Sequence, residues 1–193
     1  MNMYWVRRSA DNPMWDIRAE ARFDYRFPLP IDHDMTGIGR TIGNITPVDT
    51  TMYQLGPFIV SKSPESHIGP FKWAIDFLVL DGTPILAARD GWIRDISLKW
   101  QKWGPTSDSA NYLNYITISH GDEYSQYCHV AFPTLNCPQL VRVGDEVKAG
   151  QPISYVEKNG WTDRDHLHFM VFEDNTICNW NEFGFRSLKV TFK

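Results

Sequence analysis

Short runs of alternating apolar and polar residues, divided by Gly, Asp and Pro, fill the chain from about residue 61 onward. The alternation is strictest over residues 166–172, which predicts a β-strand with one face in a core. The core face would carry Leu167, Phe169 and Val171. The other face would carry the remaining side chains, which are His166, His168, Met170 and Phe172.

Other segments extend this pattern into a predicted sheet. Residues 74–80 form an apolar run, and residues 115–130 indicate two strands joined by a short polar loop that contains Gly. Asp-Gly pairs at 81–82 and 90–91 are hairpin signals on either side of residues 83–89, and the Gly-containing turns within 144–150 enclose another short strand. No segment has a convincing helical period, so we expect an all-β fold.

The first 58 residues differ from the rest and form a predicted N-terminal extension, with the main domain over residues 59–193. Residues 18–27 alternate apolar and charged side chains, so they could lie as an edge strand on the main sheet. We expect the extension to pack on the domain. The residues Asp32-His33-Asp34 in a Pro-rich stretch are interpreted as a solvated turn, in preference to a second metal site.

Two histidines one residue apart are the strongest chemical signal. On a strand, residues i and i+2 share a face about 6.5–7 Å apart, so His166 and His168 can point toward one site. Asp76 interrupts the apolar run 74–80, and a buried carboxylate needs a partner. His168 and Asp76 are therefore candidate metal ligands. Simpler explanations are a half-buried strand that carries two histidines, and a carboxylate paired with backbone amides, Lys or Arg.

A second histidine signal follows in residues 115–130. Tyr127 and His129 would share one face of the second strand, and His120 at the turn is expected to be solvated. The neighbouring pair Cys128 and His129 suggests a nucleophilic dyad, but adjacent strand residues point to opposite faces. We therefore set that dyad aside.

Taken in order, these elements resemble a known family. His67-Ile68-Gly69, Ile75-Asp76-Phe77, Tyr127-Cys128-His129 and His166-Leu167-His168-Phe169 are similar to the motifs of lysostaphin-type (LytM-like) zinc metallopeptidases, which cut peptide cross-bridges in bacterial cell walls. The resemblance covers roughly residues 60–175. It implies an antiparallel sheet or β-sandwich core, a duplicated hybrid motif, with the N-terminal extension packed on it.

The resemblance also implies a site. Zn²⁺ would be bound by His67, Asp76 and His168, which leaves the fourth tetrahedral position for water, as in catalytic zinc sites. His129 and His166 would be the catalytic residues that orient this water, accept its proton and stabilise the intermediate.

One departure from the family pattern concerns the first ligand. The family's first histidine usually lies four residues before the aspartate, but that position is Lys72, and a protonated lysine has no lone pair for zinc. In an alternative alignment, His67 is the ligand and residues 70–74 are an insertion whose Pro70 favours a bend. Otherwise His67 is a loop residue near an incomplete site. Arg164-Asp165 and Met170 also replace typical family residues, which should change the lining of the groove.

Three functions follow from these observations. The first is a zinc endopeptidase that acts on peptidoglycan stem or cross-bridge peptides. The second is a degenerate scaffold that binds the cell wall or regulates amidases. The third is a barrel-sandwich module that binds carbohydrate or protein, although it explains none of the histidines. Residues 97–111 are expected to form a long loop at a binding groove, with Trp92, Trp103 and Trp161 as candidates for its lining.

Composition narrows the remaining classes. The 193 residues carry a net charge of −4, which gives no electrostatic footprint for nucleic acid. No apolar run is long enough for a transmembrane helix, and the N-terminus lacks the apolar stretch of a secretory signal. The three cysteines do not form a disulfide framework. We expect a monomer, and the resemblance implies a location in the cell envelope or outside the cell.

Overall fold

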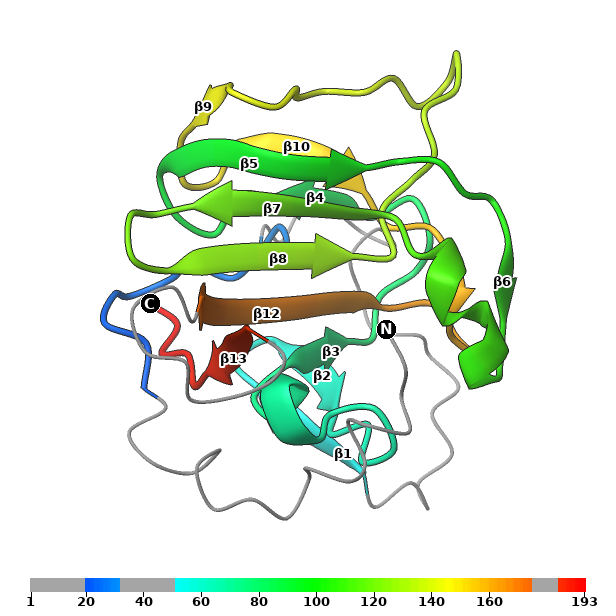
Figure 1. Cartoon of the computed structure of the whole chain (residues 1–193), viewed down its shortest axis with the longest axis horizontal. Coiled ribbons are helices and arrows are strands. Elements are labelled where there is room, and N and C mark those ends of the chain that lie inside the picture. Colours follow the sequence, from blue (N-terminus) through cyan, green and yellow to red (C-terminus); the bar gives the residue numbers. More distant parts are fainter. Residues whose placement is uncertain (1–19, 32–50, 175–183) are drawn as a thin grey trace.

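The structure is a computed structural model that describes residues 20–31, 51–174 and 184–193. Its centre is a nine-stranded sheet in which eight strands follow the order β1-β2-β3-β12-β8-β7-β5-β9, and β13 pairs with β12. Figure 1 shows β12 in the middle of this sheet. The strands of this sheet are β1 (Met52–Leu55), β2 (Phe58–Ser61), β3 (Ile75–Phe77), β5 (Gly91–Ser97), β7 (Tyr115–Ser119), β8 (Tyr124–Cys128), β9 (Glu146–Val147), β12 (Leu167–Asp174) and β13 (Phe185–Leu188).

Every pair in the main sheet is antiparallel, which confirms the all-β antiparallel prediction. A second layer consists of β4 (Pro84–Leu86) and β10 (Pro152–Tyr155), drawn behind β5 and β7 in Figure 1. Ile85 and Ile153 of this layer are buried in one hydrophobic core with Ile93 and Ile118 of the main sheet. The core therefore lies between two sheets, as in a sandwich.

The predicted alternation along β12 is confirmed. Leu167, Phe169 and Val171 are fully buried, while His168 and Phe172 line a cavity on the opposite face. Because side chains of a strand alternate between faces, the same sequence pattern supplies both the core and the floor of the cavity.

The hairpins predicted at the two Asp-Gly pairs are wrong. β4 pairs with β10 and not with β3 or β5, so both turns carry the chain between the two layers. Residues 97–111 also contain more structure than the expected loop, namely β6 (Trp103–Gly104) and the start of the 3-10 helix η3 (Ser107–Tyr112). β6 pairs in parallel with β11 (Gly160–Trp161).

Residues 20–31 pack on the core, with Tyr25 and Leu29 fully buried. They do not form the expected edge strand of the main sheet, because their β-contacts are two isolated parallel bridges to Lys189 and Phe192. The ring of Phe27 stacks on that of Phe192, with centroids 4.6 Å apart. The hairpin of β1 and β2 spans position 58, where the two predicted regions meet. The Asp32-His33-Asp34 turn and residues 18–19 lie outside the described residues.

In the part of the chain that the structure describes, no helix has the length and apolar character needed to cross a lipid bilayer.

Candidate metal centre and active site

Strand register brings Asp76 and His168 together. They lie directly opposite each other in the pair of β3 and β12, and opposed residues of antiparallel strands share one face. His168 Nδ1 is 2.9 Å from Asp76 Oδ1. These two residues therefore occupy the geometry expected from the sequence.

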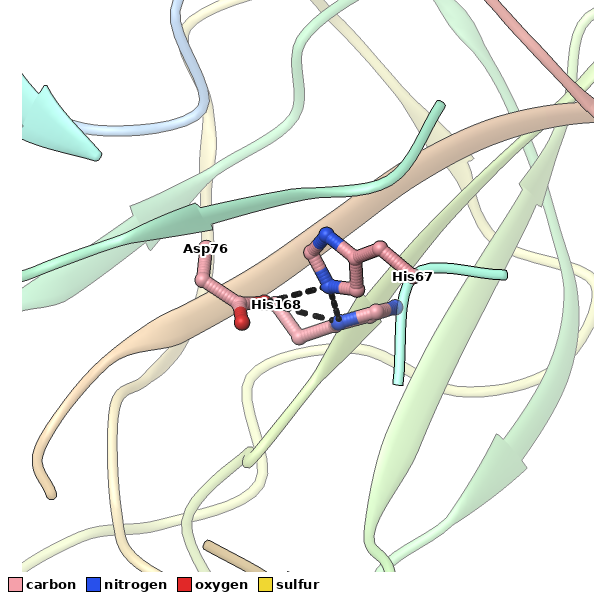
Figure 2. Close-up of side chains that lie close together, drawn as sticks. All are labelled: His67, Asp76 and His168. Atoms are coloured by element: carbon pink, nitrogen blue, oxygen red, sulfur yellow. Dashed lines mark hydrogen bonds and ion pairs between the residues drawn. The ribbon is translucent and has the colours of Figure 1, made fainter. Parts of the chain in front are cut away.

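His67 reaches the same point from a turn. After β2, the carbonyl oxygen of Ser63 accepts the N–H groups of Ser66 and His67, at 3.0 and 2.8 Å. Gly69 then takes a left-handed φ of 55° at the start of the 3-10 helix η2 (Gly69–Phe71), a backbone conformation that favours glycine. His67 Nε2 lies 3.2 Å from Asp76 Oδ1 and 3.3 Å from His168 Nδ1. Figure 2 shows the three side chains converging.

Lys72 is not part of this group. Its Nζ lies 5.5 Å from the centroid of the Trp73 ring, and the three clustered residues are His67, Asp76 and His168. The alternative alignment, with an insertion after His67, thus agrees with the geometry of the chain.

The spacing of the three atoms fits a tetrahedral metal ion. Ligand bonds of about 2.0–2.1 Å place neighbouring ligand atoms of a tetrahedron about 3.3 Å apart, and the three pairs here are 2.9, 3.2 and 3.3 Å apart. His67 Nδ1 is buried and has no hydrogen-bond partner among the described residues. The polar contacts of the His67 ring therefore all lie on the Nε2 side, where the metal would be.

The charge states suit a cation. Burial alone would raise the pKa of the Asp76 carboxyl, but the neighbouring His67 and His166, with hydrogen bonds from His168 and His67, hold this pKa well below its ordinary value. Burial lowers the pKa of His168, although the hydrogen bond with Asp76 opposes this shift. A carboxylate beside a neutral imidazole is the form in which these groups bind metals.

Ser63 supports the carboxylate from the other side. Its hydroxyl donates to Asp76 Oδ2, which leaves Oδ1 for the metal. Ser63 itself has a left-handed φ of 41°, unusual for a residue with a side chain. No sequence pattern predicted this contact, because the bond depends on the turn between β2 and His67.

His129 adopts an unexpected backbone conformation. It follows the last residue of β8 and has a left-handed φ of 61°, so the strand alternation ends before it. Tyr127 is buried in the core, whereas Cys128 and His129 both line the cavity. The expectation that Tyr127 and His129 share a face is therefore wrong. The expectation that Cys128 and His129 point apart does not hold either, although burial raises the pKa of the Cys128 thiol, which disfavours a thiolate.

Hydrogen bonds define the tautomer of His129. Its Nδ1 lies 2.6 Å from the carbonyl oxygen of Asn159, which only accepts, so Nδ1 carries the proton. Burial, followed by the nearby His166 and His168, holds the pKa of His129 well below its ordinary value. The neutral ring therefore has its free lone pair on Nε2, as a general base requires.

His166 completes the cluster. Its ring centroid is 4.2 Å from that of His129, and its Nε2 is 3.7 Å from Asp76 Oδ1. The carbonyl oxygen of Arg164 lies 3.1 Å from Nδ1 and accepts a hydrogen bond from the Nδ1–H group. All five residues predicted from the sequence thus gather at one place, His67, Asp76, His129, His166 and His168.

A cavity of about 850 Å³ is lined by Asp76, His129, His166 and His168. Its walls include Trp100 and Trp161 at the end formed by η3 and β11, and Phe172 and Phe185 along β12 and β13. The prediction that Trp161 lines the groove is confirmed. Trp92 and Trp103 are more than two-fifths exposed and are not among the residues that line this cavity.

The sequence profile of peptidase family M23 matches residues 70–180. The chain belongs to peptidase family M23. The matched residues include Asp76, His129, His166 and His168, and the match begins after His67.

Several relatives are similar to this M23 chain. Glycyl-glycine endopeptidase ALE-1 of Staphylococcus capitis is 30% identical over 128 residues, which cover 64% of this chain and 30% of the relative. Lysostaphin of Staphylococcus simulans is 30% identical over 117 residues, 61% of this chain and 20% of the relative. An uncharacterized metalloprotease of Buchnera aphidicola is 31% identical over 121 residues, 62% of this chain and 27% of the relative. The matched part thus spans less than a third of each of these relatives.

Among solved structures, the catalytic domain of the prophage-encoded M23 protein EnpA from Enterococcus faecalis is 22% identical, with a TM-score of 0.46 over 71% of this chain and 92% of that one.

Proposed function

We propose that this M23 chain is a zinc endopeptidase that cuts the stem or cross-bridge peptides of peptidoglycan. One observation carries the proposal: His67 Nε2, Asp76 Oδ1 and His168 Nδ1 converge on one point, and Asp76 and His168 line one cavity together with His129 and His166. Relatives named as a glycyl-glycine endopeptidase and as lysostaphin support the choice of substrate. We further propose that the protein acts as a monomer in the cell envelope, where such peptides occur.

When bound by His67, Asp76 and His168, zinc supplies an activated water and polarises the carbonyl of the scissile peptide. The other residues of the site transfer protons and stabilise charge. Neutral His129, protonated on Nδ1, accepts a proton at Nε2. His166 lies between His129 and Asp76. When it carries a proton on Nε2 as well as on Nδ1, it can donate a hydrogen bond from Nε2 to the developing oxyanion. Asp76 remains ionised because of its histidine neighbours.

The cavity walls would orient the substrate. The residues that line the cavity come from the turn at Ser63–Ser66, from the histidines His129, His166 and His168, and from the segments that carry Trp100 and Trp161. Residues on both sides of the scissile bond can therefore be held in the cavity, as an endopeptidase requires.

The first experiment measures zinc in protein purified without chelators or metal-affinity resin, by plasma mass spectrometry. We expect about one zinc ion per chain, retained by Lys72→Ala and lost by His67→Ala, because His67 is one of the three clustered residues and Lys72 is not. Wild-type protein that stays empty after incubation with zinc would overturn the peptidase proposal and favour the degenerate binding scaffold.

A second experiment measures activity. The zinc-loaded protein should release peptides from purified peptidoglycan, detected by mass spectrometry, and removal of zinc by a chelator should abolish the release. His129→Ala should retain zinc and lose activity, since His129 is not among the three converging ligands. Full activity of His129→Ala would remove this residue from the mechanism.

A further inference from the structure

Two fully buried asparagines lie behind His129, and the chemistry above does not use their side chains. Asn114 precedes β7, and Asn159 precedes β11. The backbone N–H of Asn114 donates to Asn159 Oδ1 at 2.8 Å. A buried amide is costly unless its polar atoms have partners, and here each side-chain oxygen and nitrogen has at least one.

The side chain of Asn159 fixes the backbone that holds the imidazole. Its Nδ2 donates to the carbonyl oxygens of Val130 and Glu157, at 2.9 and 2.7 Å. The backbone N–H of Glu157 in turn donates to the carbonyl oxygen of His129 at 2.9 Å. These bonds place the Asn159 carbonyl 2.6 Å from His129 Nδ1. The contact that determines the tautomer of His129 thus depends on the amide of Asn159.

The side chain of Asn114 holds the wall of the cavity. Its Oδ1 accepts the backbone N–H groups of Lys99 and Trp100, both at 2.9 Å. Its Nδ2 donates to the carbonyl oxygens of Trp100 and Val130, at 2.8 and 3.1 Å. Its own carbonyl accepts the backbone N–H of His129 at 3.1 Å. Asn114 therefore joins the segment that carries Trp100 to the backbone of His129.

We propose that Asn159 is a positioning residue for His129, and that Asn114 sets the distance between His129 and the Trp100 wall. The left-handed backbone at His129 makes such support necessary, because a strained conformation persists only where its surroundings impose it. This proposal rests on the proposed function in so far as His129 is the base. The hydrogen bonds of His129 can be measured whether or not His129 acts as a base.

The variants are Asn159→Ala and Asn114→Ala, with Thr83→Ala as the matched control. Thr83 is also fully buried, and its hydroxyl donates to the carbonyl oxygen of Leu80 at 2.7 Å, but it does not line the cavity. Asn159→Thr, whose hydroxyl can accept from the N–H of Asn114, replaces Asn159→Ala if the latter does not fold.

The first readout is the NMR signal of the His129 Nδ1–H proton in metal-free protein. We expect a signal protected from exchange with water in the wild type and in Thr83→Ala, and exchange at least about tenfold faster in the Asn159 variant. Equal protection in all three proteins would overturn the positioning role of Asn159. Because this readout needs neither zinc nor turnover, it decides the proposal even if the protein is not a peptidase.

The second readout is the division of the kinetic effect between kcat and KM. Asn159→Ala should lower kcat about 10–100-fold, in the range found for residues that orient catalytic groups, with unchanged KM and zinc content. Asn114→Ala should also raise KM, because the Trp100 wall is released. A Thr83→Ala variant that loses as much kcat as Asn159→Ala would show that general destabilisation explains the effect, and would overturn the proposal.

Discussion

His120 provides a pH-dependent prediction about stability. The sequence predicted a solvated residue at this turn; His120 does lie there, directly after β7, but it is half-buried. His120 Nδ1 lies 2.7 Å from the carbonyl oxygen of Asp90 and Nε2 lies 2.8 Å from Ser125 Oγ, and the Tyr25 ring contacts it edge-on. Burial lowers the pKa of His120 to about 4, and the hydrogen bond to Asp90 only partly opposes this shift.

The magnitude follows from the two pKa values. The unfolded imidazole titrates near 6.5 and the native one near 4, so between these values the unfolded state binds a proton that the native state excludes. Stability is therefore complete above about pH 6.5 and is lost as the pH falls through the window. Linkage gives a loss of about 2 kcal/mol in the free energy of unfolding between pH 7 and pH 5 from His120 alone.

Urea denaturation of metal-free wild type and His120→Gln, at several pH values, isolates this contribution, because the other histidines are common to both proteins. The free energy of unfolding of the wild type should fall by about 2 kcal/mol more than that of His120→Gln. Ser125→Ala should be less stable than the wild type but keep its pH dependence, because burial is the main cause of the shift. Parallel pH curves for wild type and His120→Gln would refute the reasoning.

Three further predictions concern the supports of the site and of the core. Ser63→Ala removes the hydrogen bond to Asp76, the proposed metal-binding carboxylate, and should weaken zinc binding about 10–100-fold in a chelator competition, while Ser66→Ala should not. Equal zinc affinities of wild type and Ser63→Ala would contradict this role. Tyr25→Phe removes the 3.0 Å hydrogen bond to buried Glu123 and should lower the free energy of unfolding, measured in urea, by about 1.5–3 kcal/mol. An unchanged urea midpoint would show that this hydrogen bond does not stabilise the fold. Phe77→Ala truncates a fully buried side chain and should lower the free energy of unfolding by about 3–5 kcal/mol. A loss below about 1 kcal/mol would show that neighbouring side chains fill the cavity.

The sequence was sufficient where a local pattern decides the structure. Alternation over residues 166–172 predicts the two faces of β12, and an aspartate in an apolar run predicts the partner of His168. Both follow from the two-residue period of a strand. The resemblance to lysostaphin-type motifs then supplied His67 and the catalytic roles of His129 and His166. His67 and His129 lie in segments too far from residues 166–172 for a local pattern to join them.

Local patterns failed where the backbone departs from a regular strand. The left-handed backbone at His129 places its side chain on the cavity face with Cys128, and not on the core face with Tyr127 where strand alternation would have put it. No sequence pattern indicated the roles of Asn114 and Asn159, because their hydrogen-bond partners come from four separate segments of the chain. The Asp-Gly pairs were interpreted as hairpins, since a turn residue shows where the chain bends but not which strand it pairs with next.

The contribution of His67 from a turn has a mechanical consequence. His67 and His168 are 101 residues apart in sequence, so an ion held by both acts as a cross-link between the turn after β2 and the central strand. Covalent links of that span stabilise by about 4–5 kcal/mol in chain-entropy models. Metal occupancy should therefore be visible in limited proteolysis, with cleavage within residues 62–73 fast in the metal-free protein and slow in the loaded one.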